Sequence, residues 1–169
     1  MNDKFLIEQR FNKSLSTYKD NAIVQNYMAK KLLNMIEKKK YCDVFEFGCG
    51  CGLLTNEFFK NFQCGNYLAN DIVQSCSEYL SKISQKIVFN CCDIEKMKLD
   101  RNFDLIISNA TFQWLQNPKT TVENFIAHLK PNGTLAFTTF GVNNFKELKK
   151  LGYGIDYLKI KDLENLFKD

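Results

Sequence analysis

The sequence lacks the spacing of metal-binding residues typical of zinc sites, and it has no long apolar run. Its single histidine is His128, and its seven cysteines include no C-x-x-C pair. Structural zinc sites take four Cys or His ligands, mostly in closely spaced pairs, so we expect no metal site. No segment reaches about 18 consecutive apolar residues, and the polar opening MNDKFLIEQRF lacks the apolar core of a signal peptide. We therefore expect a cytoplasmic protein with reduced thiols and no membrane association.

Charge of either sign is not concentrated in any part of the chain. The 23 Lys and Arg residues exceed the 19 Asp and Glu residues by a net +4, and only Arg10 and Arg101 are arginines. No basic run is long enough to act as a nucleic-acid-binding arm, so we expect no nucleic-acid partner. With 45% hydrophobic and 25% charged residues, the composition is that of a globular protein, and 169 residues suit one domain spanning 1–169.

Predicted strands and helices alternate along most of the chain. An amphipathic helix over 21–40 comes first, and its closing lysines suit the negative end of a helix dipole. Alternation of this kind predicts an α/β fold with a mainly parallel sheet and helices on both faces. The predicted strands are 42–47, 66–71, 86–91, 103–108 and 133–140, the last after a turn at 130–133; helices are predicted at 53–62, 75–80, 120–129, 144–151 and 161–168.

Three glycines alternate in the segment VFEFGCGCG, at the end of the first predicted strand. Gly48, Gly50 and Gly52 fall where the strand turns into a helix, and a side chain there would block the close approach of a ligand. Dinucleotide-binding enzymes have G-x-G-x-x-G at this place, so the strict alternation disfavours a nicotinamide-dependent reductase. The preceding acid, Glu46, suits a ligand with a positive charge; the alternative is a turn that merely needs glycine. The pattern E-x-G-x-G-x-G resembles the first motif of class I methyltransferases, which implies a Rossmann-like core and S-adenosylmethionine as cofactor.

Acidic residues follow the next two predicted strands. Asp71 closes the strand YLAND, and its carboxylate can accept hydrogen bonds from both ribose hydroxyls of an adenosine. Asp93 can accept from the adenine amino group, with a helix cap as the alternative. Ile72 is expected to pack against the adenine, and Ile94 to supply backbone and apolar contact.

Asn109 follows the fourth predicted strand and begins the segment NATFQWL. Open parallel sheets bind ligands at the carboxyl ends of their strands, so we expect Asn109 beside the methyl donor. Phe112 and Trp114 either line the substrate entrance or pack in the core. Enzymes that methylate DNA bases resemble one another in an Asn- or Asp-Pro-Pro-aromatic motif here, and this segment has no proline, which argues against a DNA substrate.

The opening Arg10-Phe11-Asn12-Lys13, together with SNATFQWL and LKPNGTLAFTTFGVNNFKELK, resembles the malonyl-carrier-protein O-methyltransferases of biotin synthesis over nearly the whole chain. The resemblance implies an enzyme that methylates the free carboxylate of a malonyl thioester on acyl carrier protein or coenzyme A. It also implies three segments: a lid region (1–40), a cofactor-binding core (41–140) and a shortened C-terminal segment (141–169). A malonyl carboxylate is ionised at neutral pH, so no catalytic base is expected.

Four residues are candidates for positioning the substrate. Tyr18 and Gln25 are expected to share one helix face in the lid if that helix begins early enough, and Trp114 to line the entrance. Arg10 is a candidate partner of the carboxylate, with a solvated surface charge as the alternative. Lys146, Lys149 and Lys150, at helical spacing, are either solvated or a docking face for an acidic carrier protein.

The C-terminal antiparallel hairpin usual in class I enzymes is missing from the sequence. We therefore expect the fifth strand to present an open edge that self-associates or pairs with another chain. This departure keeps two alternatives open: a methyltransferase for another small carboxylic acid or a quinone precursor, and an inactive or partner-dependent donor-binding module.

Overall fold

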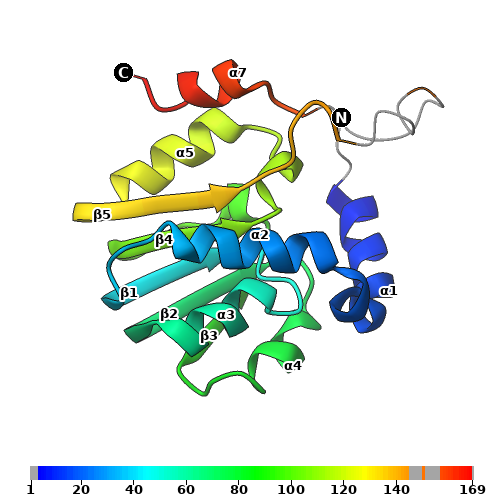
Figure 1. Ribbon diagram of the computed structural model, residues 1–169, viewed down its shortest axis with the longest axis horizontal. Coiled ribbons are helices and arrows are strands. Elements are labelled where there is room, and N and C mark those ends of the chain that lie inside the picture. The colour runs from blue at the N-terminus through cyan, green and yellow to red at the C-terminus, as the bar shows by residue number, and fades with distance from the viewer. Residues whose placement is uncertain (1–3, 145–149, 151–156, 169) are drawn as a thin grey trace.

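The structure is a computed structural model that describes residues 4–144, 150 and 157–168. Its five strands form one parallel sheet in the order β3-β2-β1-β4-β5, which confirms the predicted α/β architecture (Figure 1). The order reverses between β1 and β4, and open parallel sheets bind ligands at such a switch point. The strands are β1 (Lys40–Phe47), β2 (Gln63–Asp71), β3 (Ile87–Cys91), β4 (Phe103–Asn109) and β5 (Leu129–Thr138). The helices are α1 (Lys4–Asn21), α2 (Ile23–Asn34), α3 (Leu53–Asn61), α4 (Cys76–Leu80), α5 (Pro118–Ala127) and α7 (Ile160–Asn165), with short 3-10 helices η1 (Ile94–Lys96) and η2 (Phe112–Trp114).

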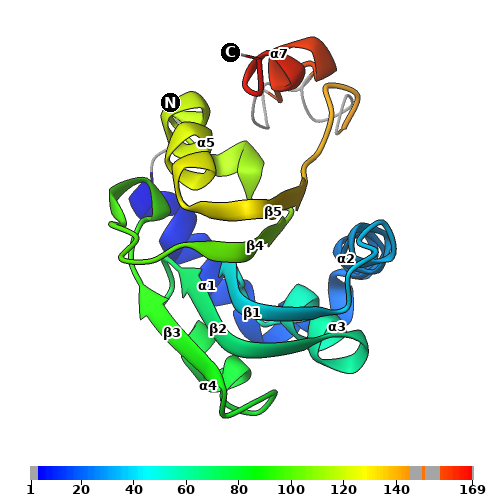
Figure 2. The ribbon, with the colours of Figure 1, turned by 90° about the vertical axis from the view of Figure 1, so that its left-hand side faces the viewer.

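Helices cover both faces of the sheet (Figure 2). Side chains alternate between the faces along a strand, so Val44 and Glu46 of β1 face α2 and α3, whereas Phe45 and Phe47 face α5. On the α5 side, Phe47 lies 4.7 Å from Phe125 between ring centroids. Each such buried side chain contributes about 1.5–3 kcal/mol to the hydrophobic stabilisation of the fold.

The predicted helix over 21–40 was wrong at both ends. The helix α2 ends at Asn34, and the lysines of the predicted last turn lie in the loop that follows and at the start of β1. A separate helix, α1, precedes α2, and Ala22 breaks the two with φ −85° and ψ 48°. In Figure 1, α1 lies beyond the arrowheads of the strands, across their carboxyl ends.

The predicted turn at 130–133 lies inside β5 as an irregularity of the strand. Leu129 pairs with Phe103 and Thr134 with Leu105, so residues 130–133 lie opposite the single residue Asp104. Asn132 has the positive φ of 63° that such a loop requires. The strand β5 thus begins earlier than predicted, at Leu129, and ends earlier, at Thr138.

Among the described residues, the last strand, β5, pairs with β4 alone and is the edge of the sheet. No antiparallel strand occurs among the described residues. A groove runs between α2 and β5, lined among others by Met28, Met35, Ala136 and Phe167. No helix in the described part of the chain is long and apolar enough to cross a membrane. None of the seven cysteines forms a disulfide.

Candidate functional site

Residues at the carboxyl ends of β1, β2 and β4, together with residues of α1, line a cleft. In Figure 1 the helix α1 lies across these strand ends. The cleft contains about 920 Å³ of empty space, counted to its open mouth. Most of the predicted site residues meet there. The lining includes Tyr18, Gln25, Glu46, Gly48, Gly50, Asp71, Ile72, Asp93, Ile94, Asn109 and Trp114. Among the described residues, no group of histidines, cysteines and acids could hold a metal ion.

The glycine turn between β1 and α3 needs glycine for two different reasons. All three glycines have positive φ, +65° at Gly48, +53° at Gly50 and +80° at Gly52, which L side chains rarely adopt. A Cβ at Gly48 would lie 2.2 Å from the Thr111 side chain, and one at Gly52 would lie 2.6 Å from Ile83. At Gly50 a Cβ would meet nothing within 4 Å. The backbone at Gly50 therefore leaves open the side from which a ligand would approach.

Asp71, at the end of β2, is tied to this glycine turn. Its Oδ2 accepts a hydrogen bond from the Gly50 N–H at 2.8 Å, and its Oδ1 accepts one from the Val73 N–H at 3.0 Å. Burial raises the pKa of Asp71, and the backbone donors oppose that rise. Each carboxylate oxygen has more than one acceptor direction, so Asp71 can hold the turn and still accept from ligand hydroxyls.

Glu46 is a buried acid in the wall of the cleft. Its side chain is 1% exposed, and its Oε2 accepts hydrogen bonds from the hydroxyls of Thr55 (2.6 Å) and Tyr67 (2.5 Å). Burial is the main cause that raises the pKa of Glu46 to about 7; the two hydroxyl donors lower it, and the charge of Asp71 raises it further. At neutral pH this carboxyl group exists in both protonation states.

Asp93 is the cap of a short helix, one of the two roles that the sequence left open. It caps η1, accepting a hydrogen bond from the Glu95 N–H, and it also lines the cleft. Its Oδ1 lies 2.9 Å from the Lys4 ammonium, which also contacts Glu95. The Glu95 carboxylate in turn accepts from the backbone N–H groups of Gln116 and Asn117. An ion cluster of Lys4, Asp93 and Glu95 thus fastens the first turn of α1 to the core.

Asn109 joins the lid region to the end of β4. Its Nδ2 donates to the carbonyl oxygen of Gln25 at 3.0 Å, and its Oδ1 accepts from the Thr138 hydroxyl at 2.7 Å. The Gln25 side chain hydrogen-bonds Tyr18, whose pKa burial raises to about 12. Tyr18 is therefore a neutral hydroxyl at physiological pH. The two residues meet across the break at Ala22 and not, as expected, on one face of a single helix.

Aromatic rings from α1 and η2 form one wall of the cleft. Phe11 lies 5.9 Å from Trp114 in an edge-to-face arrangement and 6.0 Å from Tyr18. Trp114 therefore lines the cleft, whereas Phe112 is buried in the core against Phe137. Arg10 is exposed on α1 and is not among the lining residues, so its position matches the surface alternative.

Sequence reasoning missed part of this site. Lys4, Ile7 and Leu15 also line the cleft from α1, although no helix was predicted there. The available signal was the spacing of Phe11, Leu15 and Tyr18, which places them on one helix face. Thr55 and Tyr67 were missed because nothing in a single sequence pairs a helix residue with a strand residue. Lys146 and Lys149 lie outside the described residues, and Lys150 is exposed.

The fold and the cleft were compared with known proteins. A family model described as a methyltransferase domain matches residues 45–137. The methyltransferase solved in complex with the Haloferax volcanii Trm112 activator superposes with a TM-score of 0.79 at 16% identity, covering 93% of this chain and 74% of that one. The N-methyltransferase NodS of Bradyrhizobium japonicum, solved with S-adenosyl-L-homocysteine, gives 0.68 at 17% identity, covering 94% and 83%. The fold and the cleft thus define a class I, Rossmann-like methyltransferase, the class whose methyl donor is S-adenosylmethionine.

Curated relatives define the family more narrowly. The malonyl-[acyl-carrier protein] O-methyltransferase 2 of Ilyobacter polytropus is 31% identical over 182 residues, which cover all of this chain and 70% of that protein. The chain belongs to the malonyl-[acyl-carrier protein] O-methyltransferase family. It spans between 54% and 70% of the length of eight curated relatives of that name.

Proposed function

We propose that this chain transfers a methyl group from S-adenosylmethionine to the free carboxylate of a malonyl thioester in biotin synthesis. Family membership supports the reaction, and the observation that carries the proposal is the cleft itself. It brings the buried acid Glu46, the half-buried acid Asp71 and an open glycine turn together beside an aromatic wall. The thioester would be carried on acyl carrier protein or coenzyme A.

The residues of the cleft fit the methyl donor. The backbone at Gly50 leaves room for close approach, and Asp71 keeps acceptor capacity for ribose hydroxyls. Asp93, Ile94 and Ile72 all line the cleft, which supports a role for the first two in holding the adenine and for Ile72 in packing against its face. The carboxyl group of Glu46 suits the cationic end of the donor. Asn109 would act through its bond to Gln25, which fixes the junction between α1 and α2 above the donor.

The chain needs no general base for this reaction. When bound, the donor supplies the methyl group: the carboxylate oxygen forms the bond to the methyl carbon while the carbon–sulfur bond breaks and its electron pair stays on sulfur. The protein would contribute orientation and exclusion of water, and orientation alone contributes roughly 7–11 kcal/mol in favourable cases. Tyr18, held by Gln25, would donate its hydroxyl to the substrate, and Trp114 would line the entrance.

The outer edge of β5 supports a proposal about partners. Because β5 pairs only with β4 in the part of the chain that the structure describes, its outer backbone groups are available to a second copy or a companion chain. This edge also favours the second candidate function, a donor-binding module that becomes active with a partner. We also propose a cytoplasmic location, because none of the seven cysteines is in a disulfide and that compartment keeps cysteines reduced.

Methyl transfer from labelled S-adenosylmethionine tests the proposal. We expect label in malonyl-acyl carrier protein or malonyl-coenzyme A, and none in the matched acetyl thioesters, which lack the free carboxylate. Calorimetry on the same preparation measures donor binding. Donor binding without transfer to either malonyl thioester would contradict the enzyme and support the partner-dependent module; transfer to acetyl thioesters would contradict the carboxylate as acceptor.

A further inference from the structure

The carboxyl group of Glu46 is held on one side only. The hydroxyls of Thr55 on α3 and Tyr67 on β2 both donate to the same oxygen, Oε2. Two donors on one oxygen fix the plane of the carboxyl group and leave the other oxygen, Oε1, for a different partner.

The Oε1 atom is at the wall of the cleft. Glu46 is one of the lining residues, and every hydrogen bond that its side chain makes within the described chain goes to Oε2. In the part of the chain that the structure describes, no fully buried side-chain oxygen lacks a partner. Since Oε1 has no protein partner, it must reach the cleft surface.

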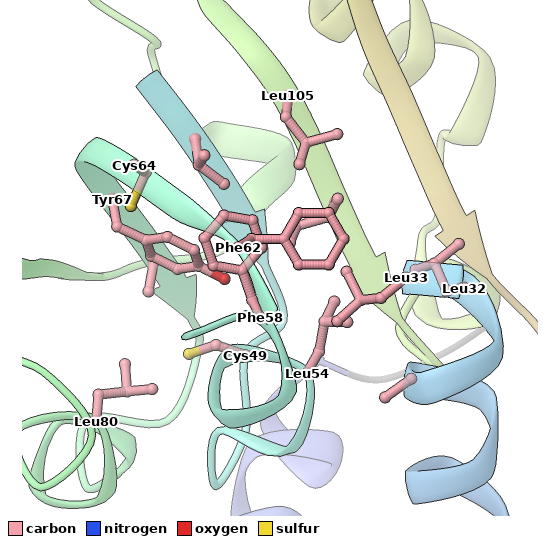
Figure 3. Close-up of a cluster of buried hydrophobic side chains, with 14 of the residues drawn as sticks. Leu32, Leu33, Cys49, Leu54, Phe58, Phe62, Cys64, Tyr67, Leu80 and Leu105 are labelled. Atoms are coloured by element: carbon pink, nitrogen blue, oxygen red, sulfur yellow. The ribbon is translucent and has the colours of Figure 1, made fainter. Parts of the chain in front are cut away.

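The tyrosine that holds Glu46 is itself fixed by packing. Tyr67 is 1% exposed, and its ring centroid lies 5.1 Å from those of both Phe58 and Phe59. Figure 3 shows the ring within the apolar cluster beside Phe58 and Phe62. Tyr67 pairs with Val44 in the parallel register, two residues before Glu46, so its long side chain runs along the sheet toward the acid. A hydroxyl supported in this way cannot follow the carboxyl group if that group rotates.

We propose that Thr55 and Tyr67 are positioning residues, which hold Oε2 of Glu46 so that Oε1 binds the ammonium group of the donor's methionine moiety. The proposal rests on the proposed function, because it assumes that the donor occupies this cleft. A further consequence is that donor binding releases the proton of Glu46 to solvent. The ammonium stabilises the carboxylate, so the bound form loses a proton that the free form holds in part at neutral pH.

Three other titratable groups face Glu46, and only one of them, Asp71, also changes its charge at acid pH. Asp71 from β2 adds negative charge, and its own pKa is raised by burial. Burial raises the pKa of Tyr67 and of Cys49, in the glycine turn, well above their ordinary values, so both stay neutral near pH 7. A ligand that contacts Asp71 but not Glu46 therefore distinguishes the contributions of the two acids to the pH dependence of binding.

Calorimetric titration with two ligands tests the proposal. S-adenosylhomocysteine carries the ammonium, whereas 5′-methylthioadenosine has the same nucleoside without the amino-acid part. With the free pKa of Glu46 near 7, wild-type protein should bind S-adenosylhomocysteine roughly 5- to 10-fold more weakly at about pH 6 than at about pH 7.5. Methylthioadenosine should show no such change, and Glu46→Gln should remove it.

Removing either hydroxyl should move this pH dependence. Donors to the carboxylate favour its charged form, so Tyr67→Phe and Thr55→Val raise the pKa of Glu46 and should weaken S-adenosylhomocysteine binding about 5-fold at pH 7.5. Thr55→Ser keeps the hydroxyl and should restore wild-type binding. Tyr41→Phe and Thr121→Val are matched controls, because each removes a buried, hydrogen-bonded hydroxyl outside the cleft.

The possible outcomes separate the two proposals. If wild-type protein binds neither ligand, the proposed function is overturned. If it binds both, but Tyr67→Phe and Thr55→Val match wild type or weaken methylthioadenosine equally, the positioning role is overturned. If Tyr67→Phe does not fold, the comparison of Thr55→Val with Thr55→Ser decides.

Discussion

The carboxylate of Asp71 and the backbone N–H of Gly50 are joined by a hydrogen bond of 2.8 Å. Gly50 lies in the glycine turn after β1, and Asp71 lies at the end of β2. The hydrogen bond therefore links the end of β2 to the glycine turn. The acid expected to bind a ribose thus also sets the position of the turn that leaves space for the ligand. Loss of the Asp71 carboxylate should therefore affect both binding and local structure.

Asp71→Ala should weaken binding of S-adenosylmethionine and S-adenosylhomocysteine by about 1.5–3 kcal/mol, or roughly 10- to 150-fold. The variant loses charge-assisted bonds to the ribose and leaves the Gly50 and Val73 N–H groups without their acceptor. Calorimetry measures the affinity. Asp100→Asn, on the surface beside Arg101, is the control and should bind as wild type does. Unchanged affinity in a folded Asp71→Ala protein would remove Asp71 from the ribose site.

The centre of the fold was predictable because its signals are local. The alternating glycines and the apolar runs before them arise from backbone geometry and burial, which leave a mark within a few residues. The five strands and the placing of Asp71 and Asp93 at the ends of β2 and β3 follow from that pattern.

The lid region was less predictable because its signals are weak or distant. The break at Ala22 involves neither glycine nor proline, so the sequence does not mark it. The helix α1 is mostly polar and contacts the core through a few side chains and the Lys4 ion cluster. The partners of Glu46, Thr55 and Tyr67, come together only through the sheet register and the docking of α3.

Gly48→Ala should destabilise the protein more than Gly50→Ala. Both sites have positive φ, which costs an alanine about 1–2 kcal/mol. Only at Gly48 does the new methyl group collide with Thr111, and displacing a packed neighbour adds roughly 1–3 kcal/mol. Urea unfolding of both variants gives the difference. If Gly48→Ala loses no more stability than Gly50→Ala, Thr111 moves aside at little cost and the expected collision is wrong. The main effect of Gly50→Ala should be weaker donor binding.

Tyr18→Phe should leave donor affinity within a few-fold of wild type and lower methyl transfer to a malonyl thioester about 10-fold. The neutral hydroxyl, held by Gln25, is expected to position the substrate more than the donor. Single-turnover assays with labelled donor measure the effect, with the exposed Tyr27→Phe as control. Equal turnover by the two variants would contradict a substrate role for Tyr18.

Lys4→Met should loosen α1 without unfolding the core. The substitution keeps the apolar stem and removes the ammonium that bridges Asp93 and Glu95. For a partly buried bridge, we expect α1 to open about 5-fold more often, with a change below about 1 kcal/mol in global stability. Hydrogen exchange in residues 4–21 measures the opening. Lys13→Met, exposed on the same helix, is the control; if both variants exchange alike, the ion cluster does not hold the lid.

The open edge of β5 lies beside a groove with apolar walls. Thr134, Ala136 and Thr138 of β5 line it together with Met35, which directly follows α2 and is 75% exposed. From Thr134 to Thr138 the strand carries no charged residue. Charges on an edge are the usual means by which proteins prevent strands from pairing, so this edge offers backbone groups and apolar surface with no such obstacle.

Wild-type protein should therefore associate as its concentration rises, and Thr134→Lys should reduce that association. The lysine places a charge at an exposed position of the edge, where pairing with a second strand would have to bury it. Light scattering over a concentration series measures the mass of both proteins. Thr120→Lys adds the same charge on the exposed surface of α5 and should associate as wild type does. If the wild type stays monomeric throughout, or if the two lysine variants behave alike, the edge of β5 is not the surface through which copies of this chain pair.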